Sequence, residues 1–272
     1  MGVVDWLQWM GVGLIKVRVG EVTLRLTNRH MQAIPCSALA PSELEITKGI
    51  VSIARAPYDL LVAGETQPFK DYAAKLAPRK PSPAVFLYDV FYTKLFELAP
   101  HLDLLVKSSI KARGRMLLSM ILYMLNTTPP TKQKMVGMSE LTARHAGYSC
   151  YPEHFEPVCQ SLLYALGQCI GPEQWTTEVE SSWKQMYSFC CYAMIPPLMD
   201  AIEKRGDKVA ACECSNPSSP SQSGAEKSIA NSSQRPRRNS VVEKAKFHQL
   251  GNSTTQEEVE HIVDVWERKA EE

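Results

Sequence analysis

The sequence predicts an all-α fold, and two patterns and one absence support this prediction. Residues 155–170 repeat apolar side chains every three or four positions, which is the spacing of one helix face. Residues 116–125 are apolar on almost every side, which indicates a helix surrounded by other helices. No convincing strand pattern occurs between residues 41 and 205. We therefore expect one helical domain over residues 41–205.

Composition limits the class of protein. The chain has 272 residues, of which 44% are hydrophobic, so it is long enough for one full core and additional segments. Its 30 basic and 29 acidic residues give a net charge of +1, and we expect no nucleic-acid partner. No run of 18 apolar residues occurs, and the first 15 residues lack the features of a secretory signal. These observations predict a cytoplasmic protein without a membrane span.

Residues 1–40 are expected to form an N-terminal extension. Apolar and polar residues alternate between Leu14 and Leu26, as they do in strands. Two such strands would meet in a hairpin at Gly20-Glu21, which would be only marginally stable alone. The extension therefore either packs on the helical domain or stays loose.

The helical domain divides at its prolines, glycines and polar segments. Pro41-Ser42-Glu43 resembles a helix start, and Pro100 ends a strongly aromatic helix. Several cysteines within the helical patterns are expected to be small buried apolar residues rather than disulfide partners. The expected helical segments are 44–63, 69–76, 84–98, a short corner at 102–106, 107–126, 155–170 and 176–202, the last with a kink at Pro196-Pro197.

A solitary histidine lies at the centre of the predicted domain. Met138, Leu141, His145 and Tyr148 share one helical stripe, so His145 is expected to face inward. Gly147 would end this helix and Pro152 would begin the next one. An inward histidine near such a corner has one nitrogen free for a ligand. The alternative is a core histidine whose two nitrogens are both hydrogen-bonded.

The C-terminal part changes in composition. Residues 206–253 are rich in Ser, Pro, Asn and charge, which predicts a disordered tail. Within it, Ser240 follows Arg237 and Arg238 in a pattern that basophilic kinases accept, although a serine-rich tail also produces such patterns by chance. Residues 254–272 regain helical spacing and are expected to form an amphipathic helix that docks back, dimerises or binds a partner.

Taken together, several segments resemble the globin family, especially neuroglobin-like and single-domain flavohaemoglobin-type globins. Residues 91–100, Phe-Tyr-Thr-Lys-Leu-Phe-Glu-Leu-Ala-Pro, are similar to the globin second helix and its end. Arg144-His145, the segment 151–155 and the run 161–166 are similar to the proximal helix, its corner and the next helix. The resemblance covers about residues 41–205 and implies a three-on-three helical sandwich around haem.

By this resemblance His145 is the proximal ligand of haem b, the iron protoporphyrin IX group, which neutral imidazole commonly binds. Leu141 would pack under the porphyrin, Phe155 and Val158 would close that side, and Arg144 would reach a propionate. Phe155 and Leu198 also stand where flavohaemoglobins place polar partners of the proximal histidine.

On the distal side, the resemblance places Tyr92 where its phenol either donates to bound dioxygen or only fills the core. Met116 takes the position usually held by a distal His or Gln, and Met120 follows one turn later. Val106 replaces the phenylalanine that most globins wedge against the haem.

The implied function is that of a haem-binding globin that reversibly binds a diatomic gas: oxygen, NO or CO. Because of its extensions, we expect a sensor or a redox-signalling protein with a reductase or signalling partner reached through the C-terminal tail. The alternative is a haem enzyme acting as an NO dioxygenase, nitrite reductase or peroxidase-like catalyst. A third hypothesis is a haem-free scaffold that retains the helical bundle.

Overall fold

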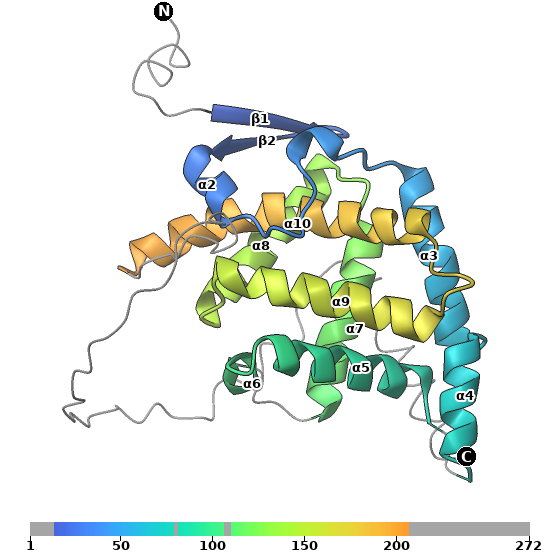
Figure 1. Cartoon of the computed structure of the whole chain (residues 1–272). Helices are drawn as coiled ribbons and strands as arrows, with labels where there is room; N and C mark the ends of the chain where they lie inside the picture. Colours follow the sequence, from blue (N-terminus) through green and yellow to red (C-terminus); the bar gives the residue numbers. More distant parts are fainter. Residues whose placement is uncertain (1–13, 79–80, 106–109, 207–272) are drawn as a thin grey trace, which may run out of the picture.

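The computed structural model describes residues 14–78, 81–105 and 110–206, and this part is mostly helical (72%). A short hairpin precedes the helices (Figure 1). The predicted helical character is therefore confirmed, with one small sheet added. The elements are β1 (Leu14–Val19), β2 (Val22–Thr27), α2 (Asn28–Ala33), η1 (Pro41–Glu43), α3 (Lys48–Ala63), α4 (Gln67–Lys75), α5 (Pro83–Leu98), α6 (Leu102–Leu105), α7 (Ile110–Thr127), α8 (Lys132–Gly147), η2 (Pro152–His154), α9 (Phe155–Ile170) and α10 (Thr177–Lys204).

Hydroxyl side chains set the beginnings of four of the longer helices. Each accepts a hydrogen bond from the backbone N–H three residues later, which satisfies a donor that the helix itself leaves without a partner. Two glycines end helices in conformations that other residues rarely adopt: Gly64 after α3 (φ 76°) and Gly171 after α9 (φ 90°). The capping residues are Thr47 for α3, Ser82 for α5, Thr131 for α8 and Thr176 for α10.

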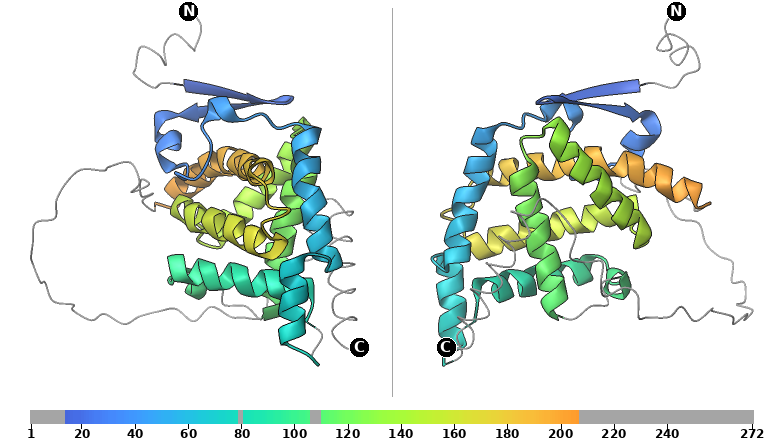
Figure 2. Two further views of the ribbon diagram at one scale, coloured as in Figure 1. Left: turned by 45° about the vertical axis from the view of Figure 1, so that its right-hand side comes forward. Right: turned by 180° about the vertical axis from the view of Figure 1, so that it is seen from behind.

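The long helices pack in two crossing groups. Helices α10, α9 and α5 run one below another across Figure 1, and α7 and α8 cross behind them. The view from behind shows α7 and α8 in front of that row (Figure 2). Helix α5 packs closely on α9, and α10 packs on both α8 and α3. This arrangement places α8 against α10.

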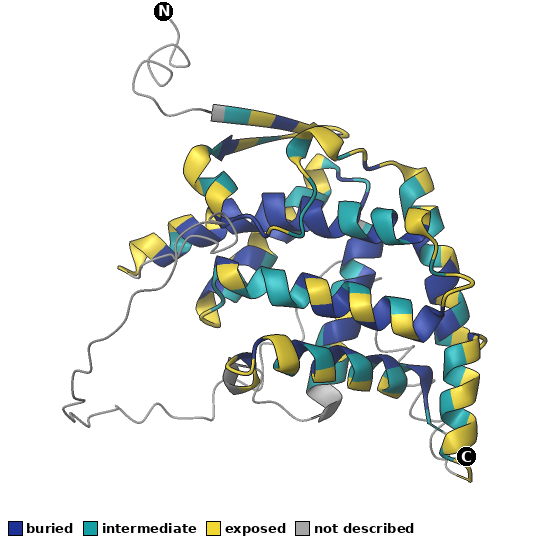
Figure 3. Cartoon of the chain, in the orientation of Figure 1, coloured by how far each residue is buried: buried dark blue, intermediate teal, exposed yellow. Residues whose placement is uncertain are grey.

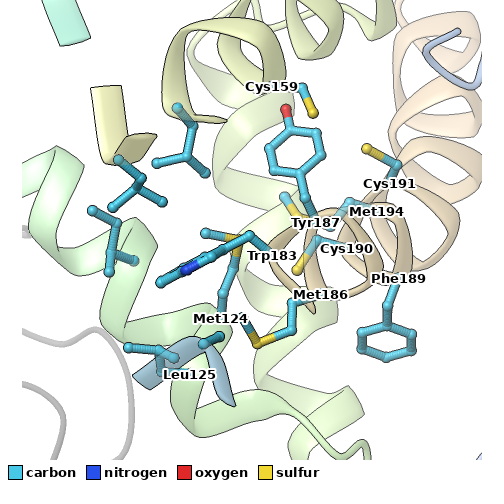
Figure 4. Packing of buried hydrophobic residues seen from close by; sticks show 14 of the residues in the cluster. Met124, Leu125, Cys159, Trp183, Met186, Tyr187, Phe189, Cys190, Cys191 and Met194 are labelled. Carbon is cyan, nitrogen blue, oxygen red and sulfur yellow. The ribbon is translucent and has the colours of Figure 1, made fainter. Parts of the chain in front are cut away.

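Helix α10 forms the middle of the core. Its residues are buried on nearly all sides over most of its length, as the dark stretch in Figure 3 shows. Trp183, Met186 and Phe189 are fully buried, and Figure 4 shows the first two beside Met124 of α7. The helix continues through Pro196-Pro197, where the sequence predicted a kink, and ends at Lys204.

The N-terminal hairpin belongs to the same packed body. β1 and β2 pair antiparallel and turn at Gly20-Glu21, as the sequence predicted. Val17, Val19 and Leu26 are buried in the main hydrophobic cluster. The loop after α2 is held on α10 by two hydrogen bonds: Leu39 N–H donates to Ser188 Oγ (2.8 Å), and Tyr192 Oη donates to the Leu39 carbonyl (2.9 Å). The apolar core therefore continues across residue 40, where we placed the domain boundary.

The cysteine prediction is confirmed for four cysteines of the helical patterns, whereas Cys150, to which it also applied, is only partly buried. Cys159, Cys169, Cys190 and Cys191 are buried free thiols within α9 and α10. Burial raises the pKa of Cys159 to about 11 and that of Cys190 to about 12. These thiols are therefore protonated at neutral pH and act as packing groups.

Candidate functional site

Helix α8 carries His145 in its last turn. The buried face of this helix is formed by Met138, Thr142 and Ala146, which are four residues apart. His145 lies at the flank of that face and is half-buried. Tyr148, which the sequence placed inward, is 61% exposed because α8 ends at Gly147 and the chain turns away. The buried face of α8 is therefore offset by about one residue from the predicted stripe. Of the predicted stripe, only Met138 is fully buried.

The imidazole of His145 is oriented by its own helix. Nδ1 lies 2.9 Å from the Leu141 carbonyl oxygen. A carbonyl can only accept, so Nδ1 donates, and in the neutral ring Nε2 keeps its lone pair. Burial lowers the pKa of His145, and the neighbouring Arg144 cation lowers it further, against the opposite effect of the Leu141 hydrogen bond. The ring is therefore neutral at pH 7, with a fixed tautomer.

The second nitrogen of His145 has no partner. Within the described part of the chain, Nε2 makes no hydrogen bond. A neutral imidazole whose Nδ1 donates to a carbonyl presents Nε2 as a metal donor.

Apolar side chains surround the end of α8. Ala146 forms a small cluster with Leu198 and Ile202 of α10, against which Phe155 packs. Tyr187 Oη donates to the Phe155 carbonyl at 2.6 Å, which fixes the start of α9. No carboxylate contributes to the pKa shift of His145. The imidazole therefore has a carbonyl rather than an acidic group behind it.

Three of the predicted pocket residues already contact the core. Leu141, Phe155 and Val158 are partly buried and pack against the main hydrophobic cluster. Leu141 lies on α8, Phe155 and Val158 lie on α9, and α10 packs on both of these helices.

Arg144 places a buried, unsatisfied nitrogen next to His145. Its Nε is fully buried and makes no hydrogen bond within the described residues. A buried donor without a partner is costly, and charged donors more so. The position therefore favours an additional acceptor at this end of α8.

The distal candidate Tyr92 lies in the aromatic core around α5. Tyr92 is buried on α5 among Tyr88, Phe91 and Phe96, and burial together with Tyr88 raises its pKa. Its hydroxyl donates to the Arg113 carbonyl of α7 at 3.0 Å. The phenol thus already has an acceptor, and this hydrogen bond connects α5 with α7.

The remaining predicted residues are less informative. Met116 and Met120 of α7 are half-buried, and Met120 packs against the core cluster. Within the described residues, no hydrogen bond or ring contact joins either methionine or Tyr92 to His145. Val106, Ser240, most of the 206–253 tail and the whole 254–272 segment lie outside the described residues.

His101 and His154 form a pair that the sequence did not predict. His101, after α5, and His154, before α9, have ring centroids 5.8 Å apart. His154 Nδ1 accepts the Tyr151 N–H (3.2 Å), and burial and the proximity of His101 lower the pKa of His154 to about 4. Residues 53 positions apart carry no local pattern, so no rule of sequence spacing predicts this pair.

An open pocket of about 280 Å³ is found elsewhere. It lies over α4, α5 and α9, and neither α7 nor α8 contributes to its lining. It is thus separate from the residues around His145. The lining side chains are Tyr72, Phe86, Asp89, Val90, Thr93, Lys94, Glu97 and Tyr164.

No group of three or more His, Cys, Asp or Glu side chains in the described ranges is arranged to hold a metal ion. Among the helices that the structure describes, none is both long and apolar enough to cross a bilayer. No protein-family model matches the chain, and no curated protein matches it.

Proposed function

We propose that the helical domain is a haem-binding globin and that His145 is its axial ligand. The observation that carries the proposal is the 2.9 Å contact between His145 Nδ1 and the Leu141 carbonyl, while Nε2 has no hydrogen-bond partner among the described residues. This contact fixes the tautomer that an axial imidazole requires. Bound haem supplies an iron with a sixth position for a diatomic gas.

The residues next to His145 fit this group by their chemistry. The unpartnered Nε of Arg144 suits a propionate carboxylate, because a charged hydrogen bond would satisfy a buried donor. Leu141, Phe155 and Val158 offer apolar side chains to the porphyrin face. The order of the helices and the packing of α5 on α9 and of α10 on α8 and α3 agree with the globin resemblance.

The surroundings of His145 favour reversible gas binding over enzymatic turnover. A carboxylate behind a ligating imidazole makes the ring more electron-donating, whereas a backbone carbonyl does so less. His145 has the carbonyl of Leu141, and the adjacent Ala146 belongs to an apolar cluster with Leu198 and Ile202. We therefore place the gas carrier or sensor ahead of the peroxidase-like, nitrite reductase and NO dioxygenase alternatives.

Haem titration of the purified chain tests this proposal. The wild type is expected to develop a Soret band and to saturate at one haem per chain, and His145→Ala is expected to lose most of that binding. His154→Ala is the matched control, because His154 is also half-buried but its Nδ1 is occupied by a backbone N–H. If both variants bind haem like the wild type, His145 is not the ligand. If the wild type binds no haem, the helical bundle is a haem-free scaffold.

Stopped-flow mixing distinguishes the gas carrier from the enzyme. The oxygenated protein is expected to react slowly with NO and with peroxide. Rapid, repeated turnover with either reagent would favour the enzymatic alternative.

A further inference from the structure

The outer face of the N-terminal hairpin is strongly basic. Residues that pair directly across two antiparallel strands project on the same side. The register pairs Lys16 with Arg25 and Arg18 with Thr23, and all four residues are exposed. We call Lys16, Arg18 and Arg25 the basic hairpin face. The opposite side of the strands is apolar and packs on the core, so the hairpin cannot turn this face inward.

The charges on this face are not balanced within the described part of the chain. Lys16, Arg18 and Arg25 make no salt bridge or side-chain hydrogen bond there. Like charges placed directly opposite each other, such as Lys16 and Arg25, destabilise a strand pair. The whole chain carries a net charge of only +1, so the basic face is a local excess. Nothing in the fold itself accounts for it.

Nearby acidic residues do not change this conclusion. Glu21 is exposed in the turn, beyond the paired cations. Glu203 at the end of α10 forms a salt bridge with Arg29 of α2. The basic hairpin face is thus open to an anionic partner, and it lies at the edge of the molecule farthest from α5 and α6 (Figures 1 and 2).

The sequence that precedes the hairpin indicates which anionic partner fits. Residues 1–13 contain two of the five tryptophans, Trp6 and Trp9, and a single charged residue, Asp5. Tryptophan is favoured at the boundary between lipid headgroups and acyl chains, and lysine and arginine are attracted to anionic headgroups. A nucleic acid would attract the same cations, but it offers no comparable environment for the aliphatic residues of this segment: Val3, Val4, Leu7, Met10 and Val12.

We propose that the protein docks on the surface of an anionic lipid bilayer through the basic hairpin face. The contact is peripheral and does not require a membrane-spanning helix. It is independent of the haem proposal, because it involves neither α8 nor α9. The hairpin would hold α10, which it contacts through β2, against the membrane.

Vesicle flotation with the full-length chain tests the proposal. The wild type is expected to float with phosphatidylcholine vesicles that contain phosphatidylserine and to stay behind with pure phosphatidylcholine. Rising sodium chloride should release it. The triple variant K16Q/R18Q/R25Q should bind roughly 100-fold more weakly, because each cation near an anionic surface contributes on the order of a five-fold factor.

The matched control is K48Q/K70Q/K75Q. It removes the same charge from exposed lysines on α3 and α4, away from the hairpin, and should bind like the wild type. All six side chains are exposed, so neither variant should lose stability. The hairpin variant should keep or raise the wild-type melting temperature, because it removes the like charges of Lys16 and Arg25.

Three outcomes overturn the proposal. The first is equal flotation with neutral and anionic vesicles, and the second is equal loss of binding in both triple variants. The third is a wild-type chain that ignores vesicles but binds single-stranded RNA through the basic hairpin face, which would make the partner a nucleic acid.

Discussion

His145 and His154 show how one residue type receives two roles from its backbone contacts. His145 Nδ1 lies against a carbonyl and therefore donates, whereas His154 Nδ1 accepts a backbone N–H. The free nitrogen of His145 can act as a ligand donor, while His154 closes the corner before α9. Hydrogen-bond direction, rather than burial alone, distinguishes the candidate ligand from the structural residue.

The low pKa of His154 predicts acid sensitivity. Its pKa is lowered from 6.5 to about 4 in the folded chain, so between these values the unfolded chain binds more protons. The free energy of unfolding should therefore fall as the pH drops from about 6.5 to about 4. Protonation would also remove the acceptor of the Tyr151 N–H.

His154→Asn tests this prediction, because its amide oxygen can replace Nδ1 as the acceptor but does not titrate. Urea unfolding at several pH values should show a smaller acid loss in the variant. Burial also lowers the pKa of His30 and His145, so part of the loss should remain. Identical pH dependence in both proteins would show that His154 is not a source of the effect.

At the scale of the element, glycines with unusual backbone geometry fix how the helices end. Gly171 ends α9 at φ 90°, and a Cβ there would lie 2.9 Å from Cγ of Pro68 in α4. Gly171→Ala is therefore expected to destabilise the fold by about 1–3 kcal/mol, because this backbone region is almost restricted to glycine.

Gly147 provides the matched control at the end of α8. A Cβ there would meet no atom within 4 Å. Gly147→Ala should leave stability unchanged or raise it by up to about 1 kcal/mol. Chemical denaturation of both variants measures the contrast, and equal effects would contradict the assigned role of Gly171.

Local patterns in the sequence predicted most of the elements. The apolar stripe of 155–170, the hairpin turn at Gly20-Glu21 and the glycine after α9 all act over a few residues, and each agrees with the structure. The short helix α2 was missed because its six residues depend on the Thr27 cap rather than on an apolar stripe. The expected start of α3 at 44 was four residues early, because Thr47 caps the helix after a separate turn at Pro41–Glu43.

The candidate site was less predictable because it depends on long-range contacts. The sequence could single out His145 but not its flank position, which is set by how α8 packs on α10. The hydrogen bond from Tyr92 to Arg113 joins two helices, and no spacing rule predicts it. Tyr148 was placed inward only because the helical stripe was extended past the residue where α8 ends.

At the scale of the whole molecule, the hairpin and the helices share one core. Leu26 of β2 is 1% exposed and belongs to the cluster that contains Trp183 and Leu162. Leu26→Ala should therefore lower the free energy of unfolding by about 2–5 kcal/mol, which is the usual effect of a leucine-to-alanine substitution in a well-packed core. The exposed Thr23 on the same strand is the control, and Thr23→Ala should change stability little.

Circular dichroism of the helices during urea unfolding reads out this coupling. A single transition that shifts with Leu26→Ala would show that hairpin and helices unfold together. An unchanged helical transition in this variant would mean that the hairpin unfolds independently and is not coupled to α10.

Restoring the ligand of a cavity variant tests the central claim most directly. His145→Gly is prepared with haem, with and without free imidazole, and the absorption spectra of the ferric, ferrous and carbonyl forms are recorded. We predict a high-spin ferrous wild type, a variant that holds little haem, and recovery of the wild-type spectra when imidazole is added. A variant that keeps the wild-type spectra without imidazole would contradict the assignment of His145 as the axial ligand.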